Sequence, residues 1–566
     1  MTLISGLHVG ASGLQTSQNA LNATAHNLSN IETTGYVRQQ VLQGDRQYNK
    51  TGSIAAIGPQ QTGLGVEFSK IRQVRDYFLD LSYRKENGRG SFYDICYETT
   101  NELETLLGEM NGAAFQETID DLWTAVEELQ KDPSSSVTQG QFINVCSQFL
   151  DRAGAVYDGL ANYQDNLNSR IKDMIDNINE IGGKICKLNQ SILNVELGVE
   201  SANDLKDQRN LLMDELSKYV KYDYTINADG VVEIRIEGEA FVSRGKGEPF
   251  EMGYTQDNAT GFYTPTWPWA QNQPVYDCSL EVSTAKNSNI GELKSLVLAR
   301  GDRRANYSDI TSEYTDPATG NVVDLYNNGS SDKMATANSI VMNAMAELDQ
   351  LVHKVVTDIN DVLTGEKDQI KAGTIPSYAN AESCPMELFV RLGTDRYVQD
   401  PGTGEYTYVP EDVSGSPANV SSMYTLSNLK INPDLLKQPT LLGYPDSGFV
   451  KPDMTVDQTK ADALADAFSN AELILNPNVT KMSNYKDYYA DMISLASNSG
   501  NVYKSFSEAQ ALTVDSLEDS RQQIMGVNSS EELTNMIKFQ NAYNASSRYI
   551  NAVSEMLEHL ISRLGG

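Results

Sequence analysis

The first 31 residues contain no Asp, Glu, Lys or Arg, although 21% of the whole chain is charged. A leucine recurs there at every seventh position, as Leu7, Leu14, Leu21 and Leu28. Such a repeat is typical of a helix that packs lengthwise against a partner helix. An ordinary surface helix carries charged side chains on its outer face, so this segment is predicted to be a helix that is covered on its outer side as well. The alternative is a disordered polar arm whose leucines are incidental.

The C-terminal end of the chain carries a matching repeat of apolar residues. We therefore predict that the two end segments form helices that pair as a coiled coil. In a ring or helical array of identical subunits, a charge would be desolvated or would lie near its own copies, and both situations cost free energy. The predicted assembly interface comprises Leu7, Leu14, Leu21, Leu28, Ile31, Met536, Phe539, Tyr543, Ile550, Val553, Leu557, Leu560 and Leu564.

Length and charge set the limits on fold and partners. A chain of 566 residues is too long for one compact domain. The net charge of −32 argues against nucleic acid or an anionic membrane as a partner, because both attract basic surfaces. No apolar run approaches the length that crosses a bilayer, and the N-terminus lacks the pattern of a cleaved secretory signal.

The periodicity of the sequence predicts a mainly α fold with β inserts, in an elongated chain that runs out and back. Residues 160–199 keep a heptad pattern that indicates one long helix, in which Gly182 and Gly183 suggest a bend or a close helix crossing. From residue 222 the pattern alternates as in strands, with a hairpin turn at 227–230. The predicted domains are a terminal coiled coil (1–70 with 526–566), a helical rod (71–220, 289–364 and 456–525), a β-rich insert (221–288) and a variable insert (365–455).

No arrangement of residues predicts catalysis or a cofactor. The five cysteines are far apart and form no Cys-x-x-Cys pair, which disfavours a zinc site or a disulfide framework and leaves a lone reactive thiol as the alternative to burial. The four histidines belong to no metal or nucleophile motif, so packing is the expected role. The aromatic residues between Tyr254 and Trp269 are interpreted as the core of the insert, with a glycan site as the alternative. We expect a protein that is not an enzyme and that binds no metal.

Two terminal motifs and one interior motif resemble a known family. The N-terminal run contains Asn27, Asn30, Thr33, Gly35 and Tyr36, which resemble the N-terminal motif of the bacterial flagellar axial proteins (rod, hook and hook-associated). The C-terminal segments 526–533 and 540–550 are similar to the matching C-terminal motif. The interior segments 202–209 and 211–217, supported by 336–364 and 485–490, resemble the hook-associated members. The resemblance covers roughly residues 1–235, 289–364 and 480–566.

The resemblance implies a structural subunit of the bacterial flagellum, at the junction between hook and filament. It implies export by the flagellar type III apparatus without a cleaved signal peptide, an extracellular location, and terminal segments that become ordered on assembly. The implied partners are other copies of the chain, hook protein, hook-associated protein 3, and a cytosolic export chaperone that binds the C-terminal helix. The implied arrangement places the paired terminal helices around the axial tube and the β inserts outside.

The chain departs from the family pattern at a few positions, and other functions stay open. Thr34 stands where the family usually has Pro, and Val37 where it commonly has Ser. Within the family the nearest alternative is hook protein itself. Outside the family, the alternative is an adhesin or other binding module whose inserts, 221–288 and 365–455, carry the function; an enzyme within an insert ranks third.

Overall fold

The computed structural model describes residues 3–45, 65–108, 115–198, 201–280, 282–310, 338–413, 420–442, 456, 458–470, 473–475 and 482–564. The chain divides into two compact units. Unit 1 comprises Met1–Gly90, Asp176–Met252 and Glu508–Gly566, and unit 2 comprises Ser91–Ile175 and Gly253–Ser507. None of the helices in these described ranges is long and apolar enough to span a membrane.

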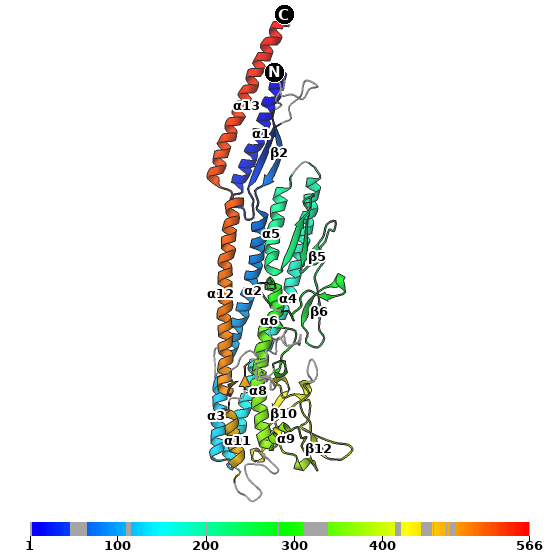
Figure 1. Ribbon diagram of the computed structural model, residues 1–566, viewed down its shortest axis with the longest axis vertical. Coiled ribbons are helices and arrows are strands. Elements are labelled where there is room, and N and C mark those ends of the chain that lie inside the picture. The colour runs from blue at the N-terminus through cyan, green and yellow to red at the C-terminus, as the bar shows by residue number, and fades with distance from the viewer. Residues whose placement is uncertain are drawn as a thin grey trace. The chain divides into compact units, whose positions relative to one another are not determined.

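Unit 1 combines both chain ends with the central β-hairpin region. Its elements are α1 (Leu3–Ser29), β1 (Gln39–Asp45), β2 (Val66–Gln73), the first part of α2 (Tyr77–Gly108), the second part of α4 (Ser136–Glu196), α5 (Asn203–Tyr219), β3 (Tyr222–Ile226), β4 (Val232–Ile236), β5 (Glu239–Val242), the end of α12 (Tyr485–Met525) and α13 (Ser529–Leu564). Figure 1 shows α13 running beside α1, and the antiparallel β1–β2 ribbon also contacts α1. The predicted pairing of the two terminal helices is therefore confirmed.

The long heptad tract forms a single helix, α4, that continues through Gly182 and Gly183 without a break. A bend or a close helix crossing at these glycines stays a prediction, whereas a close approach of a strand residue is observed there. A Cβ atom on Gly182 would lie 2.4 Å from the ring of Phe241, which comes from β5. Because Gly182 has no side chain, the ring of Phe241 from the β3–β4–β5 sheet can pack directly against the helix. The glycine is therefore explained by the space it leaves, and not by backbone flexibility.

The predicted strand pattern after residue 222 is confirmed as an antiparallel sheet of three strands in the order β3-β4-β5. The turn between β3 and β4 places Gly230 at a φ of 78°, a conformation that L side chains avoid. Arg209 on α5 donates to the carbonyl oxygen of Gly230 and to the side chain of Asn189 on α4. The hairpin turn is thereby fixed to two helices.

Three helices of unit 1 are joined by a buried series of ion pairs, which also includes Arg75 paired with Asp80. Arg521 on α12 pairs with Asp80 on α2 at 3.0 Å and with Asp214 on α5 at 2.7 Å, and Arg84 on α2 also pairs with Asp214 at 2.6 Å. The guanidinium of Arg521 lies over the ring of Tyr83. Burial alone would raise the pKa of Asp214, but the two arginines hold it below its usual value.

Unit 2 contains the remaining helices and the small sheets. Its further elements are α3 (Phe115–Lys131), β6 (Gly253–Gln256), β7 (Tyr263–Trp267), β8 (Gln273–Pro274), α6 (Glu292–Arg300), α8 (Ile340–Thr364), α9 (Lys367–Lys371), β9 (Ser377–Tyr378), β10 (Phe389–Arg391), β11 (Tyr397–Gln399), β12 (Tyr406–Tyr408), β13 (Leu429–Ile431), α10 (Pro433–Lys437), α11 (Gln458–Ser469), β14 (Leu473–Ile474) and β15 (Met482–Ser483). The strands form small antiparallel sheets, β6-β7-β8, β11-β12-β9, β10-β13 and β14-β15. Most of the buried side chains come from the helices.

The tyrosines at the start of α12 explain one part of the family resemblance. Tyr485, Tyr488 and Tyr489 are buried, and each hydroxyl group has an acceptor: a carboxylate oxygen of Asp358, the carbonyl oxygen of Glu347, and the carbonyl oxygen of Leu107. Burying a Tyr hydroxyl without a hydrogen-bond partner costs free energy, so a buried Tyr usually has one. These residues therefore specify how α12 packs in unit 2.

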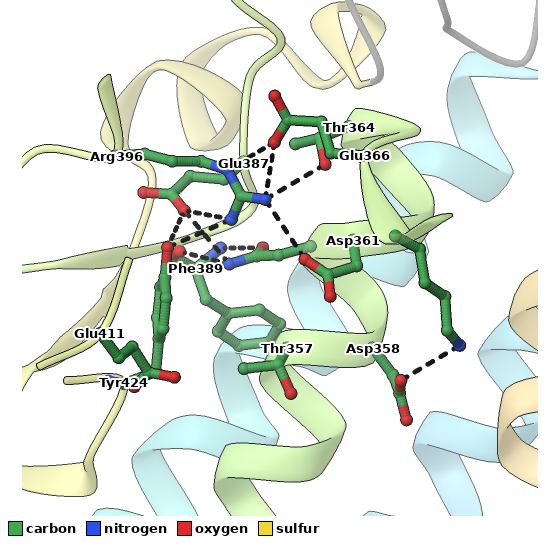
Figure 2. A network of polar contacts seen from close by, with 12 residues as sticks. Thr357, Asp358, Asp361, Thr364, Glu366, Glu387, Phe389, Arg396, Glu411 and Tyr424 are labelled. Atoms are coloured by element: carbon green, nitrogen blue, oxygen red, sulfur yellow. Dashed lines mark hydrogen bonds and ion pairs between the residues drawn. The ribbon is translucent and has the colours of Figure 1, made fainter. Parts of the chain in front are cut away.

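A buried polar network holds the segment after α8 on that helix (Figure 2). Arg396 binds Asp361 and Glu366 at the end of α8 and just beyond it, and it also binds Glu387. Tyr424 donates to Glu387 at 2.6 Å. Burial raises the pKa of Asp361 and of Glu387, and Arg396 counteracts part of that effect. The network is fully engaged in internal contacts, which indicates a structural role.

The aromatic residues of the first insert divide into core and surface. Phe262 and Trp267 are buried, whereas Tyr254 and Trp269 are exposed. The guanidinium of Arg300, also buried, packs over the ring of Phe262 and donates to Asn168. These contacts favour the interpretation of the aromatic group as insert core over a glycan platform, which would need several exposed rings on one face.

Candidate assembly site at the chain termini

The contact between α1 and α13 is lined by small residues of α1. They follow one another at intervals of three and four positions and comprise Gly6, Gly10, Gly13, Ser17, Ala20, Thr24 and Asn27. A Cβ atom on Gly10 would lie 2.6 Å from Ile550, and one on Gly13 would lie 2.9 Å from the hydroxyl of Ser546. We call this set the small-residue seam. It allows the two helix backbones to approach closely, and the register of its contacts shows that the helices are antiparallel.

The predicted interface leucines lie one position beyond members of the small-residue seam. Leu7, Leu14, Leu21 and Leu28 are each half-buried, and Ile31 is exposed in the turn after α1. The outer face of α1 is exposed and carries no Asp, Glu, Lys or Arg; its exposed residues are Ile4, His8, Ala11, Gln15, Gln18, Asn22, Ala25 and Ser29. The leucines thus border a wide uncharged surface that this chain itself leaves uncovered.

On α13, the predicted interface residues face α1 to different degrees. Val553 is buried, whereas Met536, Phe539, Tyr543, Ile550 and Leu557 are half-buried, Leu560 is exposed, and the side chain of Leu564 lies outside the described residues. Tyr549 contacts Gly6 and Gly10 of α1 but is still 42% exposed, and other large apolar side chains of α13 are exposed as well: Leu533, Ile537, Met556 and Ile561. The terminal pair therefore presents apolar surface beyond its own contact.

The N-terminal motif forms a hydrogen-bonded turn at the end of α1. Asn27 is buried, and its side-chain oxygen accepts from the hydroxyl of Tyr36 at 2.8 Å and from the backbone N–H of Gln39 at 2.9 Å. Its amide group donates to the carbonyl oxygen of Gln39 and to Glu532 on α13. Gly35 adopts a φ of 78°, which explains why a glycine is needed at this position.

Asn30 and Thr33 support the same turn. The side chain of Asn30 donates to the carbonyl oxygen of His26 at 3.0 Å, and the hydroxyl of Thr33 donates to Asn30 at 3.2 Å. The backbone N–H of Tyr36 donates to the carbonyl oxygen of Thr33. The five motif residues predicted from the sequence are therefore brought together by the structure around one turn.

Arg38 connects this turn to the joint between α12 and α13. Its backbone N–H donates to the carbonyl oxygen of Met525 at the end of α12, and its side chain binds Glu531 at 2.7 Å and Glu532 at 2.8 Å. Asn528 caps the start of α13 by accepting from the backbone N–H groups of residues 530 and 531. The C-terminal motif thus contains the residues that end α12 and those that begin α13.

The interior motif ties α5 to the same turn. Asp207 accepts from the backbone N–H of Val37 at 3.2 Å and from the side chain of Gln73 at 2.6 Å. Burial raises the pKa of Asp207 to about 7, in opposition to these hydrogen bonds. Asp204 accepts from the side chain of Gln39. The roles of Arg38 and Asp207 were not predicted from the sequence, because their partners are remote in the chain.

Nothing in the described part of the chain suggests a catalytic or metal centre. In these ranges no group of three or more His, Cys, Asp or Glu residues could hold a metal ion. His353 pairs with Glu411 at 2.8 Å and stacks on Tyr307, while Glu411 also accepts from the hydroxyl of Tyr307. These groups join α8 to neighbouring loops and bind one another.

Comparisons with known proteins agree with the terminal architecture. Residues 7–36 match the family described as flagella basal body rod protein, and residues 521–563 match the C-terminal family of the flagellar basal body rod FlgEFG proteins. These segments contain the α1 seam, its turn and α13. They place the chain among the axial structural proteins of the bacterial flagellum.

The interior of the chain gives the more specific family. Residues 100–373 match the flagellar hook-associated protein FlgK helical domain. The chain is 24% identical to flagellar hook-associated protein 1 of Bacillus subtilis (strain 168), covering 99% of this chain and 98% of that protein. It is 22% identical to the Salmonella typhimurium protein of that name and 23% identical to the Escherichia coli (strain K12) protein, each alignment covering 97% of this chain and 98% of the relative. The chain is thus similar to flagellar hook-associated protein 1 over nearly its whole length.

A solved structure described as the flagellar hook junction protein FlgK from Burkholderia pseudomallei is also similar to this chain. It shares 13% sequence identity, with a TM-score of 0.49, and the alignment covers 78% of this chain and 99% of that one.

Proposed function

We propose that this chain is a structural subunit of the junction between flagellar hook and filament, and that it assembles through its terminal helix pair. The observation that carries the proposal is the exposed face of α1, which bears no charge in a protein with a net charge of −32. A face that stays in solvent can carry charged side chains. A face that is covered by other copies of the chain cannot do so easily, because burying an unpaired charge costs free energy. The family membership of both terminal segments supports the same reading.

The partners and the domain layout are further parts of the proposal. Other copies of the chain would cover α1, while hook protein and hook-associated protein 3 would contact the two ends of the resulting ring. A cytosolic chaperone would bind the exposed apolar side chains of α13 before type III export. The inserts, 221–288 and 365–455, would lie outside the terminal coiled coil (1–70 with 526–566) and the helical rod, and they carry no part of the attachment.

The uncharged face provides a direct test. The triple variant Gln15→Glu, Gln18→Glu and Asn22→Asp adds three charges to exposed positions with almost no change in volume. We expect the variant to be made and exported normally, and cells that rely on it to carry hooks without filaments, as seen by electron microscopy. The reason is that each charge stays solvated in the free subunit and is buried only between copies.

A matched control places the same three charges elsewhere. Gln271, Asn272 and Gln273 are exposed in unit 2, and their replacement by Glu, Asp and Glu should leave filaments intact. Normal filaments in the α1 triple variant would contradict the proposal. Missing filaments in both variants would show that added charge, rather than its location, causes the defect.

A further inference from the structure

We propose that an exposed aromatic group at the start of α2 in one copy of this chain inserts into a hollow beside the turn after α1 in a neighbouring copy. The proposal rests on the proposed function, since it names a contact between assembled subunits. The group comprises Tyr77, Phe78 and Leu81, and we call it the Phe78 knob. The hollow belongs to unit 1 and is called the turn hollow.

The turn hollow has a volume of about 400 Å³. It is bounded by the turn after α1, by α5 and by the end of α12. Its apolar lining is formed by Ile31, Tyr36, Tyr83, Leu211, Met525 and Val527. A water molecule occupies about 30 Å³ in the liquid, so the hollow has room for large side chains. Charged side chains line the hollow as well: Glu32, Arg75, Asp214, Glu518 and Arg521. Ile31 and Leu211 are exposed there, so an aromatic side chain that enters the hollow has apolar surface to pack against.

The Phe78 knob consists of apolar side chains that the fold of unit 1 leaves in solvent. Phe78 is 72% exposed, Tyr77 50% and Leu81 42%. Tyr77 is also in contact with Tyr224 on β3: the ring centroids lie 5.3 Å apart, and the hydroxyl of Tyr77 donates to the carbonyl oxygen of Tyr224 at 3.4 Å. Single exposed apolar residues are common, but three within five positions of a helix form a patch that marks an interaction surface.

The knob and the hollow face in different directions on the same unit. Phe78 and Tyr83 are five positions apart on α2, which separates their side chains by roughly 140° around the helix axis. Tyr83 lines the hollow, so the knob cannot fill the hollow of its own chain without unfolding α2. A patch that fits a separate pocket on an identical molecule makes a head-to-tail contact, which generates rings or helical arrays rather than a closed pair.

Charge and position both identify the occupant as a second copy. Lys85 is exposed and lies four positions after Leu81, on the side of α2 that carries the knob, whereas Glu518 lines the hollow and Glu32 is exposed beside Ile31. The hollow is lined by three acidic side chains (Glu32, Asp214 and Glu518) and two basic ones (Arg75 and Arg521), so its net charge is opposite in sign to that of Lys85. Ile31 also continues the predicted assembly surface of α1, so the hollow adjoins the face that the proposed function assigns to copy–copy contact.

Two experiments test the contact in assembled flagella. Cells that rely on Phe78→Asp should lose swimming and carry few filaments, whereas cells with Val137→Asp should swim normally. Val137 is the matched control, because it is 76% exposed and lies on α4 in unit 2. Swimming in the Phe78 variant equal to that of the Val137 control would overturn the proposal.

The second experiment uses the double variant Phe78→Cys and Leu211→Cys. Oxidation of junctions purified from these cells should produce a ladder of dimers and larger disulfide-linked species on a non-reducing gel, and either single variant should not. Absence of a ladder, or a product that stops at the dimer, would overturn a head-to-tail contact. If the α1 triple variant still loses filaments in that case, the proposed function stands and only this contact fails.

Discussion

Replacement of Arg521 by Met is expected to lower the free energy of unfolding of unit 1 substantially. The change leaves Asp80 with only Arg75 and Asp214 with only Arg84. Breaking a buried ion pair costs about 3–5 kcal/mol when a charge is left uncompensated, and because each carboxylate here keeps one arginine, the expected loss is at the lower end of that range. The midpoint of urea unfolding, followed by circular dichroism, should fall accordingly.

The same variant should also change the dependence of stability on pH. In the native protein, the pKa of Asp214 is lower in the folded state than in the unfolded state. This group therefore stabilises the fold above about pH 4, and that contribution is lost as the pH falls through the folded-state pKa. Without Arg521 the folded-state pKa of Asp214 moves back towards the unfolded-state value, so the part of the acid-induced loss of stability that this group contributes should become smaller.

Arg72 supplies the control for this experiment. It is exposed on β2 and donates to the side chain of Gln40, so Arg72→Met removes the same charge from unit 1 without uncovering a buried carboxylate. We expect a change within about 0.5 kcal/mol. Equal destabilisation by the two variants would show that the series of ion pairs contributes no more than a surface arginine.

Replacement of Gly10 by Leu is expected to separate α1 from α13 and to abolish filament attachment. A Cβ atom at this position already lies 2.6 Å from Ile550 and 3.1 Å from Tyr549, so a leucine side chain has no space. The helices can avoid the clash only by moving apart, which breaks the contacts of the whole small-residue seam. Cells that rely on this variant should form hooks that lack filaments.

A disulfide reports on the same contact without reference to motility. A Cβ atom at position 13 lies 3.7 Å from the Cβ of Ser546, which is close to the mean distance in disulfides. The double variant Gly13→Cys and Ser546→Cys should therefore form an internal disulfide, detected by mass spectrometry after proteolysis. Addition of Gly10→Leu should prevent that disulfide.

Gly44 provides a control of equal volume change. It lies on β1, and a Cβ atom there has no other atom within 4 Å. Gly44→Leu should leave both the disulfide and the filaments unaffected. If Gly10→Leu permits the disulfide to the same extent, the close approach of the two helices at this position is not required.

The sequence predicts the terminal helices and their pairing, and it predicts the class of protein. It does not reveal which residues of α1 contact α13. A search for large apolar residues finds the leucines, which lie beside that contact. The contact within the chain is made instead by small residues such as Gly10 and Gly13. Their lack of a side chain allows the backbone of α1 to approach α13 closely. A search for small residues at intervals of three and four would have found this seam.

Other features depend on contacts that no local pattern contains. The partners of Arg521 lie 441 and 307 positions away along the chain, so nothing in the sequence near α12 indicates a buried series of ion pairs. In the same way, the sequence alone shows Gly182 only as a residue of low helix propensity. Its role is seen once the ring of Phe241 is known to pack against it. The assembly residues of α1 and α13 stay predictions that the charge and disulfide experiments test.

The bond between Asn27 and Glu532 joins positions that are 505 residues apart. Closing so large a loop is slow compared with the formation of local contacts, so the terminal pair is expected to form last as the subunit folds. A chain whose synthesis or passage through the export channel stops early has no α13 to offer. The pairing of the two ends therefore needs a chain that contains both α1 and α13.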